Sequence, residues 1–163
     1  MLYQLLQHFD TKIGLPAASA HCDIPCKIYD PATAQIAALT VVRMMDLIAE
    51  QDLSSLSGQV NLSRLVAQKE EHVQQVKNEI RVIWGDFFKQ PQFEQVPNVH
   101  DMVHGIMLQA SKCSQGMDRQ QGELLVNLVN GFAEAFWLVK DISTITATCP
   151  YPPSLSVVYP KLD

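Results

Sequence analysis

The sequence predicts an all-α protein, an antiparallel four-helix bundle preceded by a short loop that carries two cysteines. Three observations support this fold class. Apolar residues recur at steps of three and four in four separate segments of the 163-residue chain. Short polar or proline-containing stretches separate these segments, and apart from a weak case at 156–159 no segment alternates clearly enough for a strand. Four helices on short connections pack most economically as an antiparallel bundle.

The first predicted helix begins at Asp30-Pro31 and runs to about Glu50. Aspartate is a favoured N-cap, and proline suits the first helical position because an N–H there has no intrahelical partner. A polar stretch from Gln51 to Gln59 ends the helix. Its expected inward positions are Ile36, Leu39, Val42, Met45 and Ile48.

The second predicted helix has the clearest pattern and ends near Lys89. Its apolar stripe alternates steps of three and four, while charged and amide side chains occupy the other faces. The stripe consists of Leu62, Leu65, Val66, Val73, Val76, Ile80, Ile83 and Phe87. The two prolines of the following stretch, QPQFEQVP, predict a non-helical connection.

Two further helices and a tail complete the chain. The third helix is expected from about Asn98 to Ser111, and the fourth begins after Asp118, a second favoured N-cap, and fades after Lys140. The expected inward positions are Met102, Val103, Ile106, Met107 and Ala110, then Leu124, Leu125, Leu128, Val129, Phe132, Phe136 and Trp137. The tail holds four of the nine prolines and should be extended, lying on the bundle, crossing to another subunit, or loose.

Composition restricts the partners. A hydrophobic fraction of 47% is typical of a globular domain. The formal net charge is −5 with scattered Lys and Arg, so we expect no nucleic-acid partner, because phosphate contacts need a basic face. No apolar run approaches the ~20 residues that cross a bilayer, so we expect no membrane partner.

The first twenty residues end in Ala18-Ser19-Ala20, which matches the small-x-small pattern of a secretory cleavage site. The segment lacks a positive start, and four polar residues interrupt its apolar part: Gln7, His8, Asp10 and Lys12. A leader removed for another reason fits better, and a cytoplasmic location is expected. The alternative is an uncut arm that packs as a short helix through Leu2, Leu5, Leu6 and Phe9.

The segment HCDIPCKIYDP, residues 21 to 31, concentrates metal-binding atoms on one short loop. After a cut before His21, its new amino group, the Cys22 amide nitrogen and the Cys22 thiolate can close two adjacent five-membered chelate rings. Pro25 sets a tight turn that returns Cys26 as a second thiolate. A square of two nitrogens and two sulfurs favours copper(II) or nickel(II) over zinc, and the His21 imidazole can reach the axial position.

Other interpretations of these residue types stay open. A Cys22–Cys26 disulfide, a partial zinc site or two ordinary thiols would produce the same spacing. A di-iron site needs Glu-x-x-His pairs, and His72, His100 and His104 lack them. His100 and His104 stand one turn apart without an obvious third ligand and are interpreted as surface residues. Cys113 and Cys149 are expected to be structural or free thiols.

Two stretches resemble a known family. HCDIPCKIYDP resembles the nickel-binding hook of nickel superoxide dismutase, whose motif reads His-Cys-x-x-Pro-Cys-x-x-Tyr, and WGDFFKQPQFEQVP, from Trp84, resembles the family's second recognisable stretch. The similarity runs from His21 to about Lys140. It implies a cleaved leader at 1–20 and a nickel-hook and bundle domain at 21–143. The extended tail at 144–163, predicted from its prolines, lies outside the similarity.

The resemblance also implies function. The chain would form a homohexamer with one nickel ion per subunit, convert superoxide to oxygen and hydrogen peroxide, and require a protease that removes the leader. His21 would give its amino group and axial imidazole, Cys22 its amide nitrogen and thiolate, and Cys26 its thiolate. Tyr29 would limit access to small anions. The hook would be supported by Asp23, Pro25, Trp84, Asp86 and Lys89.

Three positions depart from the family. Ala37 and His72 stand where compared members carry a glutamate and an arginine that restrain the axial imidazole, and Phe87 replaces a tyrosine. A non-catalytic nickel- or copper-binding bundle for metal delivery or storage is therefore one alternative, and a secreted, disulfide-stapled helical module is another. Because a net charge of −5 repels an anionic substrate, attraction has to be local, with Lys27 and Lys89 as candidates.

Overall fold

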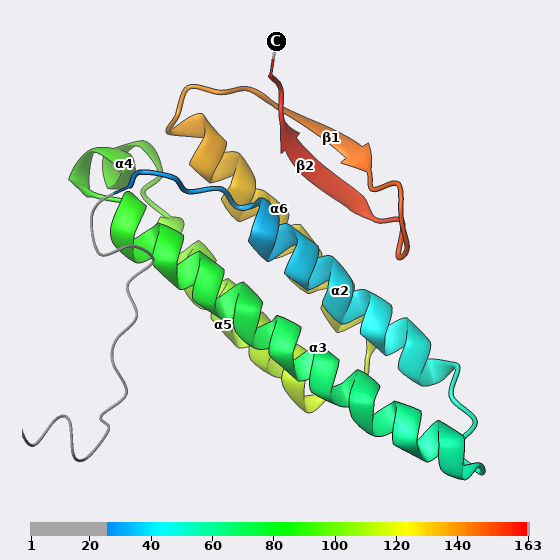
Figure 1. Cartoon of the computed structure of the whole chain (residues 1–163). Coiled ribbons are helices and arrows are strands. Elements are labelled where there is room, and N and C mark those ends of the chain that lie inside the picture. Colours follow the sequence, from blue (N-terminus) through cyan, green and yellow to red (C-terminus); the bar gives the residue numbers. More distant parts are fainter. Residues whose placement is uncertain (1–25, 163) are drawn as a thin grey trace, which may run out of the picture.

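Four long helices lie side by side in the computed structural model, which describes residues 26–162 (Figure 1). They are α2 (Ala32–Ala49), α3 (Leu56–Val82), α5 (Val99–Gln115) and α6 (Arg119–Leu138). Helix α2 packs against α3 and α6, and α5 packs against the same two helices. The predicted antiparallel four-helix bundle is confirmed.

Side-chain caps set where the helices begin. The Asp30 carboxylate accepts a hydrogen bond from the Ala32 N–H at 2.8 Å, although the helix proper starts one residue later than predicted. Helix α3 begins at Leu56, earlier than predicted, because the Ser55 hydroxyl accepts the Gly58 N–H at 3.0 Å. The Asp118 carboxylate accepts the Gln120 N–H at 3.0 Å, as predicted for the start of α6. These bonds satisfy donors that a helix start leaves unpaired.

Two apolar residues predicted to face inward are exposed, namely Ile36 at 55% and Leu124 at 44%. The buried face of α2 is built largely on small residues, including Ala34, Ala37 and Ala38, which a pattern of large apolar side chains does not reveal. Helix α2 is also the one helix among the described residues that is long and apolar enough, by length and composition alone, to cross a membrane. Here its apolar side chains pack into the bundle core.

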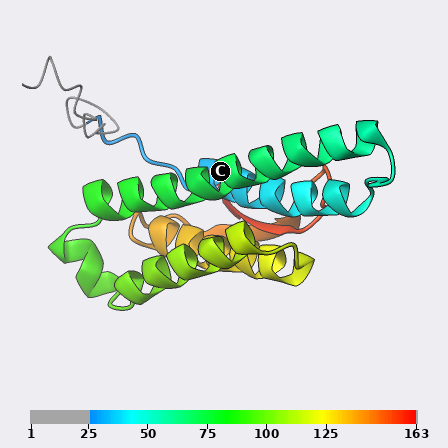
Figure 2. The ribbon, with the colours of Figure 1, turned by 90° about the horizontal axis from the view of Figure 1, so that it is seen from below.

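Helices α2 and α3 extend beyond the turn between α5 and α6 at one end of the bundle (Figures 1 and 2). Lys69 of α3 lies level with this turn, because its Nζ donates to the carbonyls of Cys113, Ser114 and Gly116. The residues of α3 before Lys69 therefore lack neighbours on that side. This explains why Leu62, Leu65 and Val66, predicted as core, are only half-buried.

Helix α5 is longer than predicted, ending at Gln115 instead of Ser111, because Lys69 binds its last carbonyls.

Two features at the end of α3 differ from the prediction, and the second shows that the predicted non-helical connection is wrong. The last turn of the second helix is a π-helix, η1 (Ile83–Phe87), closed by the Phe88 N–H donating to the Ile83 carbonyl at 3.3 Å. The stretch that contains both prolines then forms a short helix, α4 (Gln90–Gln95). Its Pro91 occupies the first turn, where no N–H is needed, so it starts a helix instead of preventing one.

The tail folds into a hairpin of two antiparallel strands, β1 (Thr144–Thr148) and β2 (Ser156–Pro160), with Thr146 opposite Val158. It lies on the bundle, one of the three predicted alternatives, and β2 packs against α6. The weak strand expected at 156–159 is confirmed within β2. Strand β1 was not expected, because four of its five residues are exposed and its sequence, TITAT, alternates little.

Candidate metal centre

The predicted nickel ligands lie at the boundary of the described chain. Cys26 lies within it and is half-buried. His21, Cys22, Asp23 and Pro25 lie outside the described residues 26–162. The donor set nevertheless suits nickel, because thiolate sulfur with amine and amide nitrogen matches its preference for tetragonal nitrogen and sulfur ligation. Within residues 26–162, no group of three or more His, Cys, Asp or Glu side chains is placed to hold a metal ion.

The chain after Cys26 leads from outside the bundle into α2 (Figure 2). Lys27 is exposed and has a φ of 58°, in the left-handed region, so the backbone changes direction directly after the cysteine. Tyr29 is half-buried and packs against the core. A cavity of about 150 Å³ separates this segment from α3 and η1, lined by Ile28, Tyr29, Asp30, Thr33, Glu79, Val82 and Ile83.

The structure brings the two family-like stretches together. The ring centroids of Tyr29, from the hook motif, and Phe87, from the WGDFFK stretch, lie 5.9 Å apart at an angle of 51°. Phe87 also contacts Phe136 of α6, with centroids 4.8 Å apart, and Phe88, with centroids 5.4 Å apart. Tyr29 is therefore held by an aromatic cluster at the η1 end of the bundle. A π-helical turn at this place is notable, because such turns are frequent at functional sites.

Two of the three predicted support residues in the described chain donate hydrogen bonds within the η1–α5 region. The Trp84 indole N–H donates to His100 Nδ1 at 3.0 Å, and Lys89 Nζ donates to the Gly85 carbonyl at 2.7 Å. Asp86 is exposed. The contacts predicted between these three side chains and the hook would involve residues outside 26–162.

Two residues of this region were missed by the sequence pattern. His100 is exposed, as predicted, but it is also the acceptor for Trp84, and its ring packs on Phe93 at a centroid distance of 4.6 Å. Lys140, placed only as the fading end of a helix, has its ammonium 5.5 Å from the Phe87 ring centroid. Neither contact has a local sequence signal, because each joins two separate elements.

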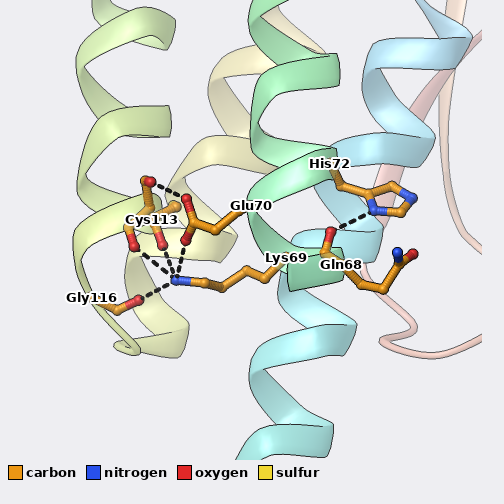
Figure 3. A network of polar contacts seen from close by, with 7 residues as sticks. Gln68, Lys69, Glu70, His72, Cys113 and Gly116 are labelled. Atoms are coloured by element: carbon orange, nitrogen blue, oxygen red, sulfur yellow. Dashed lines mark hydrogen bonds and ion pairs between the residues drawn. The ribbon is translucent and has the colours of Figure 1, made fainter. Parts of the chain in front are cut away.

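Two of the three positions that depart from the family, Ala37 and His72, lie on α2 and α3. Ala37 is 1% exposed and belongs to the core of α2. His72 Nδ1 lies 2.8 Å from the Gln68 carbonyl one turn earlier (Figure 3), so this nitrogen carries the proton, because a carbonyl can only accept.

The other cysteines are structural. Cys113 and Cys149 are buried reduced thiols that donate to the carbonyls of Gln121 and Tyr151. Burial raises the pKa of Cys113 to about 11, so the thiolate that metal binding requires is disfavoured there. This arrangement gives no support to a module stapled through these two residues.

The chain matches known proteins over the hook and bundle. The family model described as nickel-containing superoxide dismutase matches residues 16–140. The curated protein named superoxide dismutase [Ni] from Streptomyces coelicolor is 31% identical over 122 residues, which cover 75% of this chain and 89% of the relative. Its namesake from Streptomyces seoulensis is 33% identical with the same coverage.

Solved structures agree with this result. A native nickel superoxide dismutase superimposes with a TM-score of 0.67 at 30% identity, covering 74% of this chain and 99% of that one. An apo structure of the enzyme superimposes with a TM-score of 0.64 at 27% identity, covering 70% and 98%. The sequence motif, the fold and the relatives agree, and the chain therefore belongs to the nickel-containing superoxide dismutase family of oxidoreductases.

Proposed function

We propose that the superoxide dismutase activity of this family is carried out in this chain by one nickel ion per subunit, held in an N-terminal hook that begins at His21. The ligands are the amino group and imidazole of His21, the amide nitrogen and thiolate of Cys22, and the thiolate of Cys26. The observation that supports this proposal is the packing of Tyr29, the last residue of the hook motif, on Phe87 at 5.9 Å.

A bound nickel ion would supply the one-electron oxidation and reduction that convert two superoxide anions and two protons into oxygen and hydrogen peroxide. The chain's own residues provide the rest. Two anionic thiolates and an amide nitrogen favour a higher metal charge, and Tyr29, fixed by Phe87, admits small anions and excludes larger ones. The hook is supported by Asp23, Pro25, Trp84, Asp86 and Lys89.

The proposal requires processing of the chain. Residues 1–20 form a leader that a protease removes, because the amino group of His21 does not exist before that cut. Residues 21–143 then form the hook and bundle domain, followed by the tail at 144–163. We further propose that the mature protein assembles as a homohexamer in the cytoplasm, the location favoured by the poor secretory character of the leader.

The decisive experiment measures the start, metal content and activity of the natural protein together. We expect N-terminal sequencing to begin at His21, nickel to be retained, and superoxide to disappear catalytically. Cys26→Ser should lose nickel and activity, whereas Cys149→Ala, a change of a buried thiol in the hairpin region, should keep both. A functional form that begins at Met1, or a Cys26→Ser protein with normal nickel and activity, would overturn the proposal.

A non-catalytic nickel- or copper-binding bundle is the second candidate. It is favoured by the loss of both residues that restrain the imidazole in compared members, since Ala37 is a buried core residue and His72 donates to its own helix. The same purified protein distinguishes the two functions. Stoichiometric metal without superoxide turnover would favour delivery or storage.

A further inference from the structure

Lys140 occupies an unusual position at the end of α6. Its ammonium lies 4.9 Å from the ring centroid of Phe136, 5.5 Å from that of Phe87 and 5.8 Å from that of Trp137. Such distances allow attraction between a cation and the faces of aromatic rings. The end of α6 lies at the same end of the bundle as α4 (Figure 1). The positive charge of Lys140 therefore lies against the aromatic cluster that holds Tyr29.

Backbone hydrogen bonds also hold the segment around this lysine in place. The Ile142 N–H donates to the Trp137 carbonyl and the Asp141 N–H donates to the Leu138 carbonyl, both at 3.0 Å. Together with the φ of 58° at Asp141, these bonds form a Schellman motif that closes the end of α6, and Lys140 lies directly before its left-handed residue. A cation at a helix C-terminus is also stabilised by the helix dipole.

Within the described part of the chain, no carboxylate forms an ion pair with Lys140. The ion pairs of residues 26–162 use Lys69 and Arg119. The acidic residues nearest in sequence, Asp141 and Glu134, are exposed to water, as is Asp86 beside Phe87 on η1. Lys140 itself is half-buried against the rings, so its field is less screened than that of a lysine on a mobile surface loop.

The geometry limits how far this charge lies from the access residue. The ammonium and the Tyr29 ring lie 5.5 and 5.9 Å from the same Phe87 centroid, so they are at most about 11 Å apart. At such a separation a unit charge in water changes the local concentration of a monovalent anion about twofold. The effect is lost above physiological ionic strength, where the Debye length is shorter than ~8 Å.

We propose that Lys140 is a steering residue, which draws superoxide toward Tyr29 in a protein whose net charge of −5 repels that anion. This proposal rests on the proposed function and adds a cation that the sequence pattern, pointing to Lys27 and Lys89, did not identify. Its role is electrostatic: the side chain attracts the substrate through space and takes no part in the electron transfer.

The kinetic test varies charge at one position and ionic strength in solution. With processed, nickel-loaded enzyme near 10 mM ionic strength, we expect Lys140→Met to lower kcat/KM about twofold and Lys140→Glu about fourfold, with Lys140→Arg close to normal. The decline of kcat/KM with added salt should flatten in the Met variant and reverse in the Glu variant. Nickel content should not change.

Lys112→Met and Lys112→Glu are the matched controls. Lys112 is an exposed lysine in the last turn of α5. It lies about 20 Å along the helix axis from the first turn of α5. These changes alter the net charge equally and should leave the salt dependence as it is. Equal effects at positions 112 and 140, or an unchanged salt dependence in Lys140→Glu, would overturn the proposal.

A second measurement needs neither metal nor turnover. With fluorotyrosine at position 29, the ¹⁹F relaxation caused by an anionic nitroxide should exceed that caused by a cationic one, and the ratio should fall in Lys140→Met but not in Lys112→Met. An unchanged ratio would overturn the steering role. If the ratio falls while the wild-type enzyme shows no superoxide turnover, the proposed function is wrong and the local potential of Lys140 is still established.

Discussion

Phe87 shows how a single side chain joins the two halves of the site. Its half-buried ring contacts Tyr29 on one side and Phe136 on another, and it also lies beneath the ammonium of Lys140. The compared family members have a tyrosine here. The loss of that hydroxyl removes a polar contact without removing the ring, so packing of Tyr29 is retained while any hydrogen bond through position 87 is not.

Ala37 is the residue at which the departure from the family can be tested. It is 1% exposed, whereas its neighbour Ile36 is 55% exposed. We expect Ala37→Glu to lower the free energy of unfolding by about 3 kcal/mol or more, because it places a carboxylate in the core. Ile36→Glu should change it by less than about 1 kcal/mol. Denaturant unfolding measures both.

The opposite result would be informative about His72. If Ala37→Glu is as stable as Ile36→Glu, the new carboxylate has found a hydrogen-bond donor. His72 can be that donor only as an imidazolium, through its Nε2–H, because Nδ1 already donates to the Gln68 carbonyl. Such a protein should then show a sharper axial-nitrogen splitting in its nickel electron paramagnetic resonance spectrum. An unfolded or strongly destabilised variant means that this core has adapted to the absence of the glutamate.

At the scale of elements, the sequence predicts what depends on local spacing. The stripe of large apolar residues identifies α6, and Asp118 identifies its start. The hook motif likewise identifies Cys26 and Tyr29, because its residues are neighbours in the chain. Contacts between separate elements have no such local signal. Lys69 of α3 donates to a carbonyl at the end of α5, and Trp84 of η1 donates to His100 of α5. The sequence pattern did not predict α4 or β1, because both elements are short and mostly exposed.

The prediction at the scale of elements concerns Lys69, which joins α3 to the end of α5. It is 2% exposed, donates to three carbonyls at the end of α5 and pairs with Glu70 at 3.1 Å (Figure 3). Lys69→Met should lower the free energy of unfolding by about 3 kcal/mol, because three buried or part-buried carbonyls lose their donor and Glu70 loses its cation, keeping only the Ser114 hydroxyl. Hydrogen exchange should rise at the last turn of α5.

Lys77→Met is the control for this change. Lys77 also reaches from α3 to α5, but it is half-buried and donates to one hydroxyl, that of Ser111, at 2.9 Å. We expect a loss of about 1 kcal/mol and no faster exchange at the end of α5. Similar losses for the two variants would show that Lys69 is an ordinary lysine and that α5 ends at Gln115 for another reason.

At the scale of the whole molecule, the hairpin is a described part of the chain that lies outside the family match. The match ends at residue 140, and β1 begins at Thr144. The hairpin nevertheless packs as part of the bundle. Val157 and Val158 are buried, and two polar side chains of the helices donate hydrogen bonds to hairpin carbonyls. Gln35 donates to the Val158 carbonyl at 2.8 Å, and Asn130 donates to the Ser156 carbonyl at 2.9 Å.

Removal of residues 144–163 therefore tests whether the tail is an appendage or part of the core. We expect a loss of about 3 kcal/mol or more, because Gln35 and Asn130 lose backbone partners and apolar surface of α6 becomes exposed. Replacing both residues by leucine in the shortened chain should recover part of this loss, since no polar group then lacks a partner. Nickel content should persist in the shortened protein, because the proposed ligands precede α2. A shortened chain as stable as the full one would mean that the hairpin merely rests on a bundle that is complete without it.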